Sequence, residues 1–130
     1  MSSPVVYVVD DDDDCRRALG SLLTAIGVAV RTFSSPGEFL EQLPHDSWGC
    51  LITDLRMPRT SGVDLIRRLR AIDSELPVIL ISGVFHGKDA AEAEELGAVA
   101  VLSKPFGAAQ LKESLDRAFQ MLEQRRAASH

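Results

Sequence analysis

Five polar side chains directly follow short apolar runs of the sequence. They are Asp10, Asp11, Asp54, Ser82 and Lys104. Carboxylates that converge in one crevice repel one another and raise one another's pKa values unless a cation lies between them. Mg²⁺ accepts one or two carboxylates together with water and a phosphate oxygen. The set therefore indicates a magnesium site suited to phosphoryl transfer onto an aspartate.

The residue types suggest a different chemical role for each member of this set. Asp54 is the best candidate for the nucleophile, because it stands alone after its apolar run and is followed by a loop over residues 55–58 that could wrap a metal. Lys104 offers a compact positive charge for a phosphoryl oxygen or a carboxylate. The Ser82 hydroxyl can donate one hydrogen bond.

Each member of the set also has an ordinary structural interpretation. The five aspartates at 10–14 could be a solvated acidic run at the start of a helix, where negative charge meets the helix dipole. We keep that interpretation for Asp12, Asp13 and Asp14, whereas Asp10 and Asp11 end a buried strand. A single aspartate at a strand end is commonly a cap, and Lys-Pro is a common loop dipeptide. The five residues together are a far more specific signal of a functional site than any one of them alone.

The elements that must position these residues follow from the spacing of apolar side chains. Short apolar runs predict strands at 5–9, 28–33, 50–53, 77–81 and 98–102. Apolar residues at helical spacing predict helices at 15–26, 35–43, 62–72, 88–96 and 111–122, and the fourth has a weak apolar stripe that should anchor it loosely. Strands that alternate with helices form a parallel sheet covered on both faces. The predicted fold is an open, doubly wound α/β sheet, whose ligands bind at the carboxyl ends of the strands.

Composition limits the class of protein further. The chain has 130 residues with 45% hydrophobic and 25% charged side chains, which is typical of one folded domain. A net charge of -5 argues against direct binding of nucleic acid. No apolar run approaches the length of a membrane span. Cys15 and Cys50 have no metal-binding spacing, and we expect both to pack as small free hydrophobes, which fits a reducing cytoplasm.

The sequence resembles the response-regulator receiver domains of two-component signalling, and within them the FixJ-type branch. The resemblance covers residues 4 to about 122. It is carried by V-V-D-D at 8–11, T-D-L-R-M-P at 53–58, S-G-V-D-L at 61–65, I-S-G at 81–83 and K-P-F at 104–106. It implies a flavodoxin-like or CheY-like α/β fold, a five-stranded parallel sheet in the order 2-1-3-4-5 with five helices. It also implies a single receiver domain over 1–126 followed by a tail over 127–130.

The resemblance assigns the acidic residues to two tasks. Asp54 would be the phosphoacceptor. Mg²⁺ would be held by Asp11, Asp54 and the backbone carbonyl of Arg56, with Asp10 acting through water. A backbone ligand explains why an arginine can occupy position 56.

The resemblance also implies roles at the other strand ends and a set of partners. Ser82 would turn its hydroxyl toward the phosphoryl group, and Lys104 would contact a phosphoryl oxygen across a cis bond to Pro105. The phosphodonor would be a histidine kinase, and the face formed by the fourth helix, fifth strand and fifth helix would serve as an output or homodimer surface. Such a domain is not a turnover enzyme, although it catalyses its own phosphorylation and dephosphorylation in the cytoplasm.

Some features depart from the family pattern and keep alternatives open. Val101 stands where most receivers carry an aromatic switch residue, and the loop after the fourth strand contains Phe85, which we expect to pack, and His86, which we expect to be solvated. A pseudo-receiver that acts by contact alone therefore remains an alternative. An aspartyl-nucleophile phosphatase is disfavoured because it needs an acid where Arg56 stands. The sequence does not decide between a single-domain regulator and part of a longer protein that continues into a DNA-binding domain.

Overall fold

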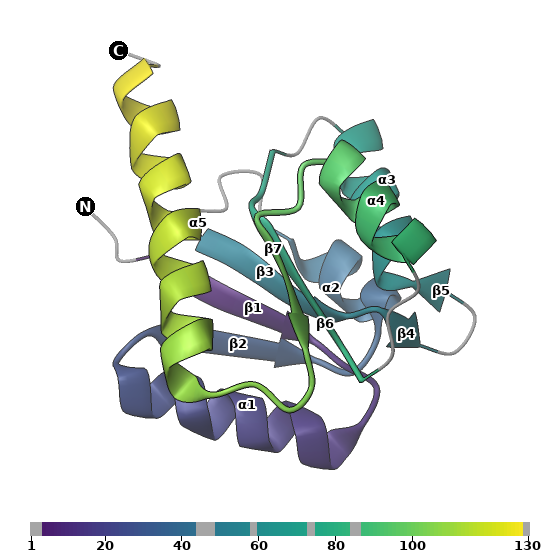
Figure 1. Cartoon of the computed structure of the whole chain (residues 1–130), viewed down its shortest axis with the longest axis vertical. Coiled ribbons are helices and arrows are strands. Elements are labelled where there is room, and N and C mark those ends of the chain that lie inside the picture. Colours follow the sequence, from purple (N-terminus) through teal and green to yellow (C-terminus); the bar gives the residue numbers. More distant parts are fainter. Residues whose placement is uncertain (1–3, 44–48, 58–59, 73–74, 84–86, 129–130) are drawn as a thin grey trace.

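A five-stranded parallel sheet in the order β2-β1-β3-β6-β7 lies at the centre of the molecule (Figure 1). The strands are β1 (Val5–Val9), β2 (Ala29–Phe33), β3 (Gly49–Asp54), β6 (Val78–Ser82) and β7 (Ala100–Ser103). This computed structural model describes residues 4–43, 49–57, 60–72, 75–83 and 87–128. Since β6 and β7 are the fourth and fifth strands of this sheet, the order is 2-1-3-4-5, and the predicted fold class is confirmed.

Helices cover both faces of the sheet (Figure 1). On one face lie α1 (Asp13–Ile26) and α5 (Ala108–Ala128), whose apolar side chains pack on the sheet residues Val6, Ile52 and Ile79. The other face carries α2 (Pro36–Gln42), α3 (Gly62–Ala71) and α4 (Gly87–Glu95). The strand residues alternate between these two clusters, because successive side chains of a strand point to opposite faces. Burial on both faces explains why the inner strands are continuous apolar runs.

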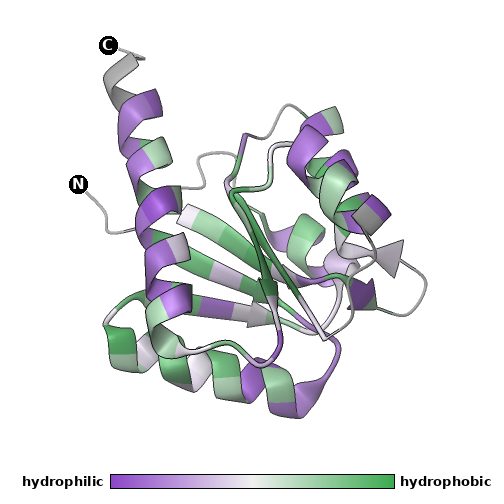
Figure 2. Cartoon of the chain, in the orientation of Figure 1, coloured by the Kyte–Doolittle hydropathy of each residue, from purple (hydrophilic) through white to green (hydrophobic). Residues whose placement is uncertain are grey.

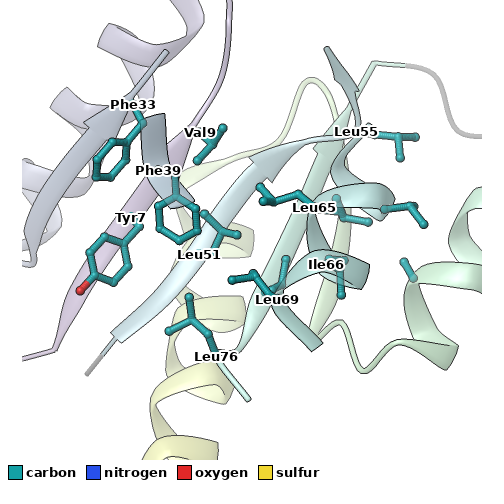
Figure 3. Packing of buried hydrophobic residues seen from close by; sticks show 14 residues of the cluster. Tyr7, Val9, Phe33, Phe39, Leu51, Leu55, Leu65, Ile66, Leu69 and Leu76 are labelled. Carbon is teal, nitrogen blue, oxygen red and sulfur yellow. The ribbon is translucent and has the colours of Figure 1, made fainter. Parts of the chain in front are cut away.

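The core on the α2 and α3 side combines aromatic and leucine side chains (Figure 3). Phe39 is fully buried between Tyr7 and Phe33, with ring centroids 5.6 and 5.4 Å away. Leu65 and Leu69 fill the space between α3 and the sheet (Figure 3). The inner strands are mainly hydrophobic, whereas the helices alternate hydrophobic with hydrophilic residues (Figure 2). This core fixes the strands whose ends carry the candidate site.

Local hydrogen bonds set where the helices begin and end. Asp12 caps α1 by accepting from the Cys15 N–H at 3.0 Å, and Asp13 and Asp14 occupy the first turn, as predicted. Ser61 and Asp64 form a reciprocal capping box at the start of α3. Gly27 ends α1 with a φ of 100°, a backbone conformation that favours glycine.

α4 is attached more through polar groups than through apolar ones. Ala93 is its one buried side chain within the described part of the helix. Arg67 of α3 forms an ion pair with Glu92 at 2.6 Å, and the Arg70 Nε donates to the Leu96 carbonyl at 2.9 Å. The predicted weak apolar stripe of this helix is confirmed.

Several boundaries differ from those predicted. The expected loop over 55–58 contains β4 (Arg56–Met57), which pairs antiparallel with β5 (Thr60–Ser61). Strands of two residues are too short to show the period-2 pattern that identifies a strand in sequence. β7 begins at Ala100 rather than at 98, and α5 extends over Ala108–Ala128 rather than over 111–122. Across the described ranges, no helix is both long and apolar enough to cross a membrane.

Candidate functional site

Asp54 lies at the carboxyl end of β3, and both of its carboxylate oxygens are engaged. Its Oδ1 accepts from the Arg56 backbone N–H at 3.1 Å, and its Oδ2 accepts from the Lys104 ammonium at 3.1 Å. The residue is only 8% exposed. The backbone beyond it is held by the Leu55 N–H, which donates to the Ile81 carbonyl at 2.9 Å. The nearly buried Asp54 carboxylate therefore lies at the carboxyl end of the central strand, beside the Lys104 ammonium.

Lys104 reaches this carboxylate from the end of β7. Its backbone N–H donates to the Ser82 carbonyl at 2.8 Å, and its peptide bond to Pro105 is cis, as predicted. Burial lowers the pKa of Lys104, but the hydrogen bond and charge of Asp54 and the charge of Asp10 outweigh burial and raise it overall. The ammonium therefore stays protonated at neutral pH and provides a permanent positive charge.

Asp10 is fully buried at the end of β1. Its Oδ1 accepts from the Asp12 N–H at 2.9 Å, while its Oδ2 has no hydrogen-bond partner among the described residues. Burial raises the pKa of Asp10, with a further increase from the charges of Asp54 and Asp11 and an opposing effect of the Asp12 N–H and Lys104. The charges of Asp54 and Asp11 act on Asp10 in the direction expected of converging carboxylates, but burial is the larger cause. Asp11 follows it and is exposed.

The oxygen atoms at this edge fit a hard divalent cation. A buried carboxylate oxygen without a partner is costly, and a cation or its bound water would satisfy the Asp10 Oδ2. Within the described residues, no group of three or more His, Cys, Asp or Glu side chains could hold a metal by itself. Asp10, Asp11 and Asp54 are therefore not gathered as a cluster of three carboxylates in the described structure. The predicted set, in which Asp11, Asp54 and the backbone carbonyl of Arg56 bind the ion directly and Asp10 binds through water, stays a prediction. The exposed Arg56 lies at the start of β4.

The structure places the remaining predicted residues around this group. Ser82 ends β6, is 2% exposed, and pairs with Ser103 of β7 in the sheet register. Val101 pairs with Leu80 and packs on the cluster beneath α3 and α4. Phe85 and His86 lie outside the described residues. The structure therefore joins Asp54 and Lys104 through their side chains and Ser82 through its backbone contact with Lys104, while Asp10 lies near enough for its charge to act on Lys104.

Cys15 is a neighbour of the site that the sequence analysis missed. We expected it to pack as a small hydrophobe, but its Sγ lies 3.8 Å from the Lys104 Nζ. Its position in the first turn of α1, directly after the five aspartates at 10–14, was the signal that could have placed it there. Cys50 behaves as expected: it is fully buried in the core, and burial raises its pKa to about 12. Both cysteines are free thiols.

Comparisons with known proteins show which proteins this chain is similar to. A family model described as a response regulator receiver domain matches residues 6–116. The response regulator protein TodT of Pseudomonas putida is 38% identical over 123 residues, which make up 95% of this chain and 54% of that protein. The transcriptional regulatory protein FixJ of Bradyrhizobium diazoefficiens is 37% identical over 118 residues, or 91% of this chain and 58% of that protein.

Solved structures show the same likeness. The crystal structure of FixJ-N matches with a TM-score of 0.85 and 38% identity, covering 92% of this chain and 96% of that one. The chain spans a little over half the length of the curated relatives named above.

Proposed function

The chain belongs to the response regulator receiver domains of two-component systems, and on that basis we propose that it is a signalling switch that accepts a phosphoryl group on Asp54. The observation that carries this proposal is the contact between the Lys104 ammonium and the nearly buried Asp54 carboxylate at 3.1 Å. The two residues are 50 positions apart, and each lies at the carboxyl end of its own strand. A strand-end carboxylate beside a cation is suited to an incoming phosphoryl group.

In the proposed reaction, one carboxylate oxygen of Asp54 attacks the phosphorus of a phosphohistidine on a histidine kinase. A new O–P bond forms while the P–N bond to the donor imidazole breaks. The imidazole leaves with the electron pair and takes up a proton. The second half of the cycle is hydrolysis of the acyl phosphate by water, which releases inorganic phosphate and returns Asp54 to its carboxylate. The domain modifies itself in both steps and does not turn over a separate substrate.

The neighbouring residues would stabilise the negative charge of the phosphoryl group during this transfer. Lys104 would exchange its bond to the Asp54 Oδ2 for one to a phosphoryl oxygen, because both are anionic acceptors. The Ser82 hydroxyl would donate to another phosphoryl oxygen. Asp11, Asp54 and the Arg56 carbonyl would hold Mg²⁺, with Asp10 acting through water. When bound, that ion would neutralise charge on the phosphoryl oxygens.

The remaining expectations concern partners and extent. We propose a histidine kinase as the donor and the face made by α4, β7 and α5 as an output or homodimer surface. We also propose that residues 1–126 act as one receiver unit. The transcriptional role of FixJ belongs to that protein, and a DNA-binding output for this chain is a proposal that depends on a longer parent.

The experiment that tests the function is intact-mass spectrometry after incubation with acetyl phosphate, with and without Mg²⁺. Wild type should gain one phosphoryl group only with Mg²⁺, and Asp54→Asn should gain none. Asp116→Asn is the matched control, because Asp116 is an exposed aspartate on α5. Unchanged uptake by Asp54→Asn would remove Asp54 from the role. No uptake by wild type would favour a pseudo-receiver that acts by protein contact.

A further inference from the structure

Cys15 connects the first turn of α1 to the lysine of the site. Its Sγ lies 3.8 Å from the Lys104 Nζ, and the same ammonium lies 3.1 Å from the Asp54 Oδ2. Cys15 and Lys104 are 89 positions apart in the sequence. An ammonium has three N–H donors and can therefore bind both atoms at once.

The backbone around Cys15 holds its side chain in this place. The Cys15 N–H donates to the Asp12 Oδ1 at 3.0 Å, which closes the helix cap. The Arg16 Nη1 donates to the Asp10 carbonyl at 2.8 Å and ties the same turn to the end of β1. Neither of these two bonds uses the Cys15 thiol, although the thiol also interacts with the Asp12 carboxylate. Substitutions at position 15 therefore keep the backbone bond of the cap while they change the thiol's contacts with Lys104 and Asp12.

The thiol differs from the other neighbours of Lys104 in charge. Burial raises the pKa of Cys15, Lys104 opposes that increase, and the charges of Asp12, Asp10 and Asp54 add to it. Cys15 is therefore a neutral thiol at neutral pH. A neutral acceptor can direct one N–H of the ammonium without neutralising its charge, whereas a further carboxylate would compete with Asp54.

We infer that Cys15 is a positioning residue, whose Sγ orients the Lys104 ammonium toward Asp54 and thereby sets the rate at which the chain takes up a phosphoryl group. The inference rests on the proposed function and adds to it a residue that acts through Lys104. Cys15 itself would not touch the phosphoryl group.

The first test compares Cys15→Val, which removes the acceptor and keeps a similar volume, with Cys15→Ser, which keeps an acceptor. We expect Cys15→Val to lower the rate constant of uptake from acetyl phosphate with Mg²⁺ by about three- to tenfold, the size of one hydrogen bond. Cys15→Ser should stay within about twofold of wild type on the same ground. In a Lys104→Met background, Cys15→Val should have no further effect. An equal loss in both backgrounds, or no loss in either, would overturn the role.

A second measurement detects the contact without phosphorylation. Alkylation of Cys15 by iodoacetamide, followed by intact mass, should slow in Lys104→Met, because loss of the nearby positive charge leaves less thiolate. Lys112→Met, at an exposed lysine of α5, is the matched control and should not change the rate. Cys50 is fully buried and should stay unmodified.

The two measurements separate failure of the inference from failure of the proposed function. Equal alkylation rates in Lys104→Met and Lys112→Met would mean that the contact is absent. Normal uptake with no difference between Cys15→Val and Cys15→Ser would overturn the positioning role alone. No uptake by wild type, together with slowed alkylation in Lys104→Met, would overturn the proposed function, and the role would fall with it.

Discussion

Gly62 begins α3 directly behind the end of β3, and we expect its replacement by alanine to destabilise the protein. A Cβ built at this position would lie 2.7 Å from the Asp54 carbonyl oxygen, 3.2 Å from the Leu55 Cα and 2.5 Å from the Leu80 Cδ2. The Gly62 N–H also donates to the Leu55 carbonyl at 2.8 Å. A leucine methyl can rotate away, but the backbone of Asp54 and Leu55 must shift to make room.

The expected free-energy change is the difference between two opposing effects. Replacing glycine by alanine normally stabilises a helical position by about 0.5–1 kcal/mol, because the unfolded chain loses freedom. Forcing an extra carbon into a packed core costs about 1–3 kcal/mol. Subtracting the middle of the first range from the middle of the second gives a net loss in the free energy of unfolding of about 1 kcal/mol, which lowers the Tm by roughly 4 °C for a domain of this size.

The assay is thermal and urea unfolding followed by circular dichroism, with Gly37→Ala as the matched control. Gly37 lies in the first turn of α2, and a Cβ there would meet nothing within 4 Å. That variant should be as stable as wild type or slightly more stable. Gly62→Ala should also take up phosphate more slowly, because the displaced backbone carries Asp54. A Gly62→Ala protein as stable as Gly37→Ala would refute the reasoning about close backbone approach.

Three further predictions concern other parts of the molecule. Burial raises the pKa of Cys50 in the folded protein to about 12, above the ordinary value of 9.0 for a thiol. The stability that this group contributes is therefore complete below pH 9.0 and is lost as the pH rises toward 12. Between about pH 8 and about pH 10.5, the free energy of unfolding measured with urea should fall by about 2 kcal/mol more for wild type than for Cys50→Ala. Parallel pH profiles of the two proteins would contradict this. Arg70→Ala should lower the free energy of unfolding by about 1–3 kcal/mol, because the half-buried guanidinium donates to two backbone carbonyls at 2.9 and 3.1 Å. Arg67→Ala removes only exposed ion pairs and should lower it by less than about 1 kcal/mol. Equal losses in unfolding experiments would contradict that contrast. Mg²⁺ at about ten times its Kd should stabilise wild type by about 1.4 kcal/mol, and a Tm increase of the same size in Asp11→Asn would remove Asp11 from the proposed metal site.

Much of the fold could be predicted from sequence because its signals are local. The run Val5–Val9 and the apolar spacing of α1 are visible within one element, and their alternation along the chain requires a parallel sheet. The positions of Asp10, Asp54, Ser82 and Lys104 after four of the five apolar runs were enough to predict that they lie at the same end of the sheet. The short strands β4 and β5 were missed, since two residues carry no periodic signal.

By itself, the sequence determined which residue types stand at the ends of the strands, and therefore the kind of chemistry this edge can perform. Tertiary structure alone decided which of those residues touch. The 3.1 Å contact between Lys104 and Asp54 and the 3.8 Å contact between Lys104 and Cys15 join residues 50 and 89 positions apart. The close approach of Gly62 to Asp54 likewise depends on how α3 packs against β3. Periodicity fixes the face on which a side chain lies, but distances between elements follow from the packing of the whole core.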